Sequence, residues 1–339
     1  MKAAVLYAPG NICIEEVPYL KIKDDEVLVQ VYSCGICGTD FHVYKGEREV
    51  KLPLIQGHEI AGKVVEVGKK VDKELLNKRV TIEPNFTCGK CFFCKTGRYI
   101  LCENRRTLGL SLSGGFAEYL AIPAEYVWEI SEHISYDEGA IVEPLTVGFH
   151  AVDRANIRVG QKVVVFGLGI IGLSIVQFAK LAGAQICSVD LVEDRLELAS
   201  QLGAEKTINA AQEGSNLDSA INEWSNGSID RIFEAIGLPF VQEQALRLVR
   251  PGGKLILVGQ SENPMKLSSL FVTRREIEII GTLACNYDFP TVIDLLNKGY
   301  LTGKPLITHR FNLNQVKEAY EAIERKEAIK VVLHCQKQD

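Results

Sequence analysis

The sequence predicts an α/β protein with two domains, one rich in β-strands and one built on a doubly wound parallel sheet. The chain has 339 residues, which is enough for two domains at ~150 residues each. Short runs of Val, Ile and Leu, separated by Gly, Pro and Asp, fill residues 1–130 and are typical of strands. Later in the chain, apolar strands alternate with segments of helical length, which indicates βαβ units.

Local patterns predict the individual elements. The β-rich part rests on alternating apolar runs, VLVQVYS, GKVVEVG and KRVTIEP. KVVVFG is a fully apolar strand, residues 170–182 have helical length and periodicity, and QICSVD is the next strand. The alternation continues through DRIFEAIG, a helical stretch ending at Leu246, GKLILVG and EIEIIGTL. The parallel-sheet domain is therefore predicted to span residues 148–285.

The end of the chain returns to a mixed character. Two helices are predicted near FPTVIDLLNKG and LNQVKEAYEAIERK, followed by a last strand at IKVVLHC. The β-rich domain is therefore predicted to consist of residues 1–147 and 286–339, with the parallel-sheet domain inserted between these two pieces.

Composition narrows the function classes. Hydrophobic residues make up 47% and charged residues 24%, as in an ordinary globular protein, and the net charge of −5 disfavours nucleic-acid binding. No signal peptide is recognised at the N-terminus, and the longest apolar stretch, residues 163–176, is shorter than the ~18 residues of a membrane span. We therefore expect a cytoplasmic protein without a membrane partner. In that compartment ten cysteines indicate metal ligands before disulfides.

A glycine motif predicts a dinucleotide site. Gly167, Gly169 and Gly172 follow the strand KVVVF and open a helix, where glycines permit a tight turn, close approach of a pyrophosphate and helix–strand contact. Asp190 ends the next strand and suits the ribose of NAD, because a carboxylate repels the 2′-phosphate of NADP. A generic strand-to-helix turn is the alternative. Arg195 either touches the ribose or adenine side or is a solvated helix residue.

Four cysteines close together predict a structural zinc. Their spacing suits tetrahedral zinc, and four protein ligands leave no position for a substrate, so the metal would order the lobe at residues 85–105. An iron–sulfur cluster is the main alternative, but the bacterial cluster pattern ends with a gap of three residues and a proline. Unpaired core cysteines are the other alternative. The four ligands are Cys88, Cys91, Cys94 and Cys102.

A second metal site is suggested by Cys37, His58 and Glu59. Thiolate, imidazole and carboxylate are a plausible catalytic set for zinc when one position stays open. Taken singly, Cys37 and His58 are equally compatible with core packing. Glu143 ends an apolar run before Pro144, where it either begins a helix or points a carboxylate at a metal.

These motifs together identify a resemblance. The chain resembles the zinc-dependent medium-chain alcohol and polyol dehydrogenases, in particular the sorbitol dehydrogenase branch. The resemblance covers essentially the whole length, with every motif in the family's order. It rests on GICGTDFH, GHEIAGKVVEVG, the four-cysteine lobe, GGFAEY, EPLTVGFHA, GLGIIG and GGKLILVG. It implies a β-rich GroES-like catalytic domain and a Rossmann domain that binds NAD.

The resemblance also assigns roles to single residues. Cys37 and His58 would ligate the catalytic zinc, Glu59 would be a direct or alternating ligand, and Glu143 would stand at the third protein ligand's position. Thr39 would touch the substrate hydroxyl, and His42 would be the distal histidine of the proton relay. Lys330 would meet the cofactor pyrophosphate. The remaining predicted cofactor contacts are Ile170, Ile171, Ile236, Val258, Gly259 and Leu283.

The expected reaction is reversible hydride transfer between a secondary alcohol and NAD, with two zinc ions per chain. The alcohol would be a polyol, sugar alcohol, sugar acid or sugar phosphate. Ala284 and Cys285 replace an Arg-Tyr pair typical of sorbitol dehydrogenases, which argues against sorbitol itself. Tyr44, Asn286 and Tyr287 are candidate replacements, and a packing or loop role is an equal alternative for each. An L-threonine 3-dehydrogenase-like enzyme, a simple alcohol dehydrogenase and a catalytically silent binding protein are alternatives. We expect a homo-oligomer, a tetramer or a dimer.

Overall fold

The computed structural model describes residues 1–336, which form two compact units. The first unit comprises Met1–Glu143 and the chain from Asn286 onward, and the second comprises Pro144–Cys285. The sequence-based boundaries stood at 147 and 286. The first change of unit occurs within helix α4 (Val142–Ala155), so a continuous helix runs through it. No helix among the described residues is long and apolar enough to cross a membrane.

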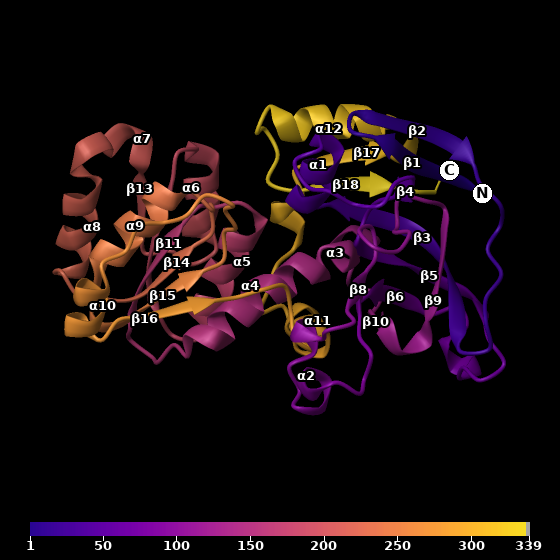
Figure 1. The fold of residues 1–339 in the computed structure, drawn as a ribbon, viewed down its shortest axis with the longest axis horizontal. Helices are drawn as coiled ribbons and strands as arrows, with labels where there is room; N and C mark the ends of the chain where they lie inside the picture. Colours follow the sequence, from indigo (N-terminus) through magenta and orange to yellow (C-terminus); the bar gives the residue numbers. More distant parts are fainter. Residues whose placement is uncertain (337–339) are drawn as a thin grey trace. The chain divides into compact units, whose positions relative to one another are not determined.

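The first unit is organised around a seven-stranded sheet (Figure 1). Strand β9 (Tyr119–Pro123) pairs with β3 beside the main path of this sheet. The strands of that path are, in spatial order, β10 (Val127–Glu129), β6 (Arg79–Ile82), β5 (Glu59–Val67), β3 (Glu26–Ile36), β18 (Val331–His334) and β17 (His309–Asn312). The smaller sheets contain β2 (Asn11–Glu16), β1 (Lys2–Ala8) and β4 (Leu54–Ile55), and then β7 (Asn85–Phe86) and β8 (Arg106–Thr107).

The last described strand completes the sheet that the first segment of the chain begins. β18 pairs antiparallel with β3, with Val331 opposite Ile36 and His334 opposite Ser33. This pairing explains why the chain beyond residue 286 belongs to the first unit. The helices of this unit are α1 (Gly38–Lys45), α2 (Phe92–Lys95), α3 (Tyr136–Ala140), α11 (Phe289–Asn297) and α12 (Val316–Glu324).

One half-buried carboxylate joins four elements of this unit. Asp137, in the first turn of α3, accepts hydrogen bonds from Ser33 Oγ (2.7 Å), His334 Nε2 (3.0 Å) and Arg310 Nε (2.7 Å). Burial raises the pKa of Asp137, but the hydrogen bonds from His334, Ser33 and Arg310 outweigh it and hold the pKa well below its usual range. The charged carboxylate is therefore the form that stabilises the fold.

Asp137→Asn is expected to lower the free energy of unfolding at pH 7 by about 2 kcal/mol, because hydrogen bonds to a charged group are lost. Because folding lowers the pKa of Asp137, its carboxylate stabilises the fold fully at pH values above about 4, the pKa of an Asp in the unfolded chain. This stabilisation is lost as the pH falls from about 4 through the lower pKa of the folded state. Urea unfolding should show a constant difference between wild type and variant from pH 8 to 5 and a smaller one below about 4. Asp153→Asn, at an exposed position, is the control. Equal stability of wild type and Asp137→Asn at pH 7 would contradict this assignment.

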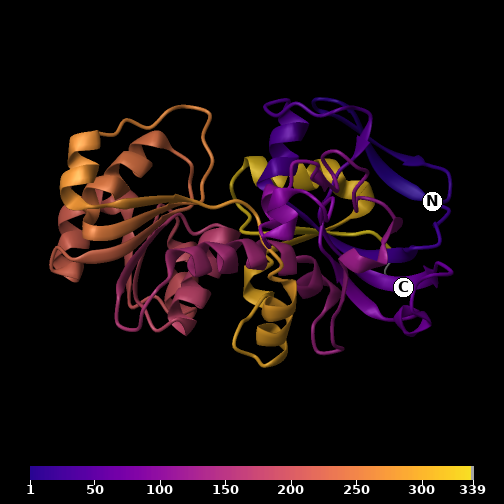
Figure 2. The same cartoon turned by 60° about the horizontal axis from the view of Figure 1, so that its bottom comes forward.

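The second unit contains a six-stranded parallel sheet flanked by helices (Figure 2). The order reverses between β11 and β14, so helices on either side of this point cover opposite faces. The strands are, in spatial order, β13 (Lys206–Asn209), β12 (Gln185–Asp190), β11 (Lys162–Phe166), β14 (Ile229–Glu234), β15 (Val249–Leu257) and β16 (Glu278–Gly281). Besides most of α4, the helices of this unit are α5 (Ile170–Leu181), α6 (Glu193–Gln201), α7 (Ala210–Glu213), α8 (Leu217–Ser225), α9 (Pro239–Leu248) and α10 (Ser269–Arg275). The predicted fold class is thus confirmed.

Candidate active site and metal centres

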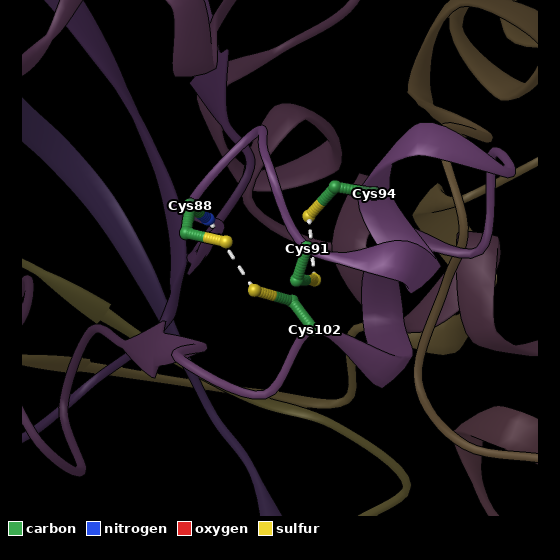
Figure 3. A group of neighbouring side chains, drawn as sticks. All are labelled: Cys88, Cys91, Cys94 and Cys102. Atoms are coloured by element: carbon green, nitrogen blue, oxygen red, sulfur yellow. Dashed lines mark hydrogen bonds between the residues drawn. The ribbon is translucent and has the colours of Figure 1, made fainter.

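The four clustered cysteines converge in one small lobe. Their Sγ atoms all lie within 4.8 Å of one another, and Figure 3 shows the four thiols turned toward a common centre. The chain reaches this geometry by turning twice: Cys91 caps α2, Cys94 lies within it, and Cys102 follows a short 3-10 helix. Four sulfur ligands at these separations fit tetrahedral zinc, and none of the ten cysteines is in a disulfide.

The electrostatics of the lobe favour a metal. Hydrogen bonds from the backbone amides of Lys90 and Cys91 lower the pKa of Cys88 to about 6, which favours the thiolate that zinc requires. Burial raises the pKa of Cys94 to about 11, so this thiol needs a bound cation to ionise near neutral pH. Phe92 is 66% exposed, and the lobe offers little apolar core to hold its own shape. These features support a structural metal.

Two residues considered for substrate binding contact this lobe or its surroundings. Asn286 donates from Nδ2 to Gly97 O (2.7 Å) and accepts from Ile100 N (3.4 Å), so its amide fastens the lobe to the later chain. The ring of Tyr287 lies edge-on to Trp128. Because both ends of its amide are engaged by backbone, the structure favours the packing role for Asn286 over substrate binding.

Cys37, His58 and Glu59 form the second cluster, and their ligand atoms also lie within 4.8 Å of one another. Cys37 follows β3 and caps α1, while His58 and Glu59 stand at the start of β5. Because β3 and β5 pair antiparallel with Gly35 opposite Glu59, the end of one strand meets the beginning of the other. Sulfur, imidazole and carboxylate within this distance fit a zinc ion with an open position.

A residue that the sequence analysis missed organises this cluster. The fully buried Asp40 accepts from Cys37 N (2.9 Å) and Gly57 N (3.3 Å), and its Oδ1 lies 3.5 Å from His58 Nδ1. Burial lowers the pKa of His58, but the charges of Asp40 and Cys37 outweigh it and raise this pKa well above its usual value. Asp40 is three residues beyond the helix cap, so its capping-box position is the signal that identifies it in the sequence.

Glu59 is held by a buried cation. Lys330 Nζ lies 2.6 Å and 2.8 Å from the two carboxylate oxygens of Glu59 and donates to Ile36 O (2.9 Å). The ammonium group of Lys330 thus pairs with Glu59, a contact that the resemblance did not imply. A buried carboxylate requires a partner charge, and Lys330 is only 3% exposed. Lys330 therefore supports the metal cluster through Glu59, and its contact with the cofactor pyrophosphate stays a prediction.

Glu143 lies close to this cluster but is not among its three closely spaced ligand residues. It is buried at the start of α4. Burial raises its pKa to about 7, with His58 and Lys330 opposing that rise and Glu59 adding to it. Whether it or Glu59 is the metal's third ligand stays a prediction.

The two residues assigned to the proton relay lie on α1. Thr39 is half-buried in its first turn, and its backbone N–H donates to Cys37 Sγ (3.5 Å). His42 is one turn further on and exposed, with Nδ1 2.6 Å from Glu47 Oε2. Residues three apart on a helix share a face. The half-buried Thr39 is therefore next to the cluster, and the exposed His42 is on the same face of α1, one turn nearer to solvent.

The glycine motif has the geometry that its spacing predicts. Gly167 joins β11 to α5 with φ of +88°, which favours glycine, and a Cβ on Gly172 would collide with Gly167 O. At Gly169, in contrast, a Cβ would meet no atom within 4 Å. No protein neighbour requires glycine there, and open space at the N-terminus of α5 fits an approaching phosphate.

The other predicted cofactor residues of this unit gather at one edge of the parallel sheet, where open α/β sheets bind ligands. Asp190 ends β12, and its carboxylate accepts from Leu168 N (2.6 Å), Leu191 N (2.7 Å) and Val192 N (3.0 Å). The remaining residues follow the carboxyl ends of β11, β14, β15 and β16 or begin the adjoining helices: Ile170, Ile171, Arg195, Ile236, Val258, Gly259 and Leu283.

One β-rich unit with two metal clusters and one parallel-sheet unit with a dinucleotide motif define a zinc-binding, nucleotide-dependent dehydrogenase. Comparison with known proteins supports this class. Residues 23–132 match the alcohol dehydrogenase GroES-like domain, and residues 171–298 match the zinc-binding dehydrogenase family. The chain is 37% identical to a sorbitol dehydrogenase of Bacillus subtilis over 98% of its own length and 97% of that protein's.

Two solved structures resemble the whole chain. A zinc-binding dehydrogenase of Sinorhizobium meliloti bound to NADP has a TM-score of 0.93 and 31% identity, with 98% of each chain covered. An Escherichia coli alcohol dehydrogenase in complex with NADH has a TM-score of 0.93 and 30% identity, with 98% of this chain and 99% of that chain covered. The chain belongs to the zinc-dependent medium-chain alcohol and polyol dehydrogenase family.

The predicted family, fold class and enzyme class are thereby confirmed, as are zinc and a nicotinamide dinucleotide as cofactors. The protein is an alcohol or polyol oxidoreductase with a small-molecule substrate. The alternative of a catalytically silent binding protein is not favoured, because the Cys37 cluster is complete.

Proposed function

We propose that the protein oxidises a secondary hydroxyl of a polyol, sugar alcohol, sugar acid or sugar phosphate to a ketone, with NAD as hydride acceptor. The carbon loses a hydride to the nicotinamide, and the hydroxyl loses a proton. The observation that carries the proposal is the Cys37–His58–Glu59 cluster, which is separate from the four-cysteine lobe. The four-cysteine lobe fills all four positions of a structural zinc. The Cys37–His58–Glu59 cluster has three ligand residues and therefore leaves a position where a substrate oxygen can bind.

The protein's own groups would hold the metal and move the proton. Cys37 and His58, with Glu59 or Glu143, would hold zinc, whose Lewis acidity makes an alcohol easier to deprotonate. The Thr39 hydroxyl would accept the substrate proton and hand it on toward His42. His42 is exposed, so its imidazole exchanges protons with solvent, and Glu47 orients the ring. Asp40 would keep His58 directed at the metal.

A substrate panel tests this function. Secondary alcohols, polyols, sugar phosphates, aldonates and threonine are each supplied with NAD, and NADH absorbance is recorded with and without a chelator. We expect NADH formation with at least one polyol-type compound and its loss with the chelator. Activity confined to threonine or to simple alcohols would favour the alternatives, and chelator-resistant activity would contradict the zinc assignment.

The NAD preference rests on Asp190. Its carboxylate would stand against the extra phosphate of NADP, and like charges in contact cost several kcal/mol, so kcat/KM with NAD should exceed that with NADP by about 100-fold. Asp190→Asn keeps an oxygen for the backbone amides but removes the charge, and should narrow this ratio about tenfold. Initial rates with both cofactors measure it, with Asp153→Asn as control. A wild-type preference for NADP would contradict the prediction.

A homo-oligomer, dimer or tetramer, is part of the proposal. Among the described residues β16 pairs only with β15, so its outer edge offers backbone hydrogen bonds to a second copy. None of the ten cysteines forms a disulfide, which supports a reducing, cytoplasmic location. Light scattering after size exclusion would measure the assembly, and a monomer would contradict this part.

A further inference from the structure

A buried network of hydrogen bonds links helix α12 to the Cys37–His58 cluster through Gln56 and Asp40. Tyr320 OH donates to Gln56 Oε1 (2.8 Å), and Gln56 Nε2 donates to Asp40 O (2.9 Å). Asp40 in turn accepts from Cys37 N and Gly57 N. Gln56 is only two residues before His58. Its hydrogen bond to Asp40 O therefore connects the His58 segment to α1, the helix that Cys37 caps.

These polar groups are deeply buried. Gln56 and Asp40 are 0% exposed and Tyr320 is 1% exposed. Leu or Met would fill the volume of Gln56 without the cost of burying an amide. A buried amide and a buried phenol persist at low cost only when they are paired, and here both ends of the amide are used. The hydrogen bonds of Gln56 are directional, so they fix the position of the His58 segment relative to α1 and α12, which apolar packing would not do.

Aromatic packing fixes the far end of the chain. The Tyr320 ring stacks on Tyr44 with centroids 4.3 Å apart and planes at 10°, and it lies 6.2 Å from the Phe41 ring. Phe41 and Tyr44 both belong to α1, the helix that carries Asp40. Tyr320 thus holds α1 through ring contacts and holds the His58 segment through Gln56. Tyr44, considered above for substrate binding, is engaged in this stack.

We propose that Gln56 and Tyr320 are positioning residues of the catalytic metal centre. They keep the Cys37 and His58 segments at the separation that zinc requires before the metal binds. The inference rests on the proposed function insofar as Cys37 and His58 hold zinc. Groups that orient metal ligands commonly contribute 10–100-fold to metal affinity or activity, and we expect effects of this size.

The test compares chelator resistance of the two zinc ions in Tyr320→Phe and Gln56→Leu. Zinc retained per chain is measured over a series of chelator concentrations, and the four-cysteine zinc serves as internal reference. We expect the chelator concentration that removes the catalytic zinc to fall about tenfold in Tyr320→Phe and about 100-fold in Gln56→Leu. The structural zinc should be unchanged, and added zinc should restore kcat in both variants.

Tyr126→Phe is the matched control, because it also removes a phenol oxygen that bonds within this unit, at Thr87 N (2.8 Å). Its catalytic zinc should be retained as in wild type. Wild-type retention of the catalytic zinc in Tyr320→Phe overturns the inference, even if Gln56→Leu does not fold. Equal weakening of both zinc ions also overturns it, because that result indicates general destabilisation. A wild-type protein with only the four-cysteine zinc instead overturns the proposed function, and the inference with it.

Discussion

Cys37→Ser is expected to lower kcat/KM by about 1000-fold or more while the protein stays folded, because the metal's several kcal/mol of charge stabilisation is lost. Cys37 contributes the soft sulfur of the cluster and stands at the cap of α1. Serine keeps an oxygen for the cap but binds zinc poorly. Initial rates with the best substrate of the panel, together with circular dichroism, measure both effects.

His58→Ala should reduce activity to a similar level, and the double variant should be little worse than either single one, since the two residues act as a unit. Cys13→Ser is the matched control, because Cys13 is exposed on β2 and lies outside both clusters. NAD binding, followed by fluorescence, should be unchanged in all of these variants. Near-normal turnover in Cys37→Ser would show that the cluster is not catalytic.

Cys91→Ser is expected to destabilise the protein strongly. The four-cysteine lobe has little apolar core, so metal binding supplies much of the free energy that orders it. A loss of about 4 kcal/mol in a unit of this size lowers the Tm by about 10 °C. Differential scanning fluorimetry measures the shift, and a chelator should produce a similar shift in wild type but add little in Cys91→Ser.

Cys91→Ser should lower stability and spare catalysis, whereas Cys37→Ser should do the reverse. At a temperature where Cys91→Ser remains folded, its kcat should stay within a few-fold of wild type, because the lobe does no chemistry. Cys13→Ser again serves as control for loss of a thiol. An unchanged Tm with a collapsed kcat would reverse the roles assigned to the two clusters.

Short-range sequence patterns predicted much of the fold and pointed to both metal clusters. The helix predicted over residues 170–182 is α5, Ile170–Leu181, and the strand QICSVD is β12. Each follows from apolar periodicity within a few residues. The four cysteines lie within fifteen residues, and their spacing alone indicated a metal. The glycine motif likewise depends on one strand and the helix directly after it.

Residues that act across long separations were harder to predict. Lys330 and Glu59 are 271 positions apart, and only the pairing of β18 with β3 brings them together. A lysine pattern cannot distinguish a phosphate partner from a buried carboxylate. Gln56 and Tyr320 are 264 positions apart, and neither has a local signature. The contacts of Asn286 were hard to predict for the same reason, since its partner Gly97 lies 189 positions away.

The most direct measurement is the zinc content and activity of wild type and Cys37→Ser, determined on the same samples. We expect about two zinc ions per chain and NAD-dependent polyol oxidation in wild type, and about one zinc ion and no oxidation in Cys37→Ser. Wild-type protein with a single zinc ion, or Cys37→Ser that keeps both ions and its activity, would contradict a catalytic metal held by Cys37 and His58.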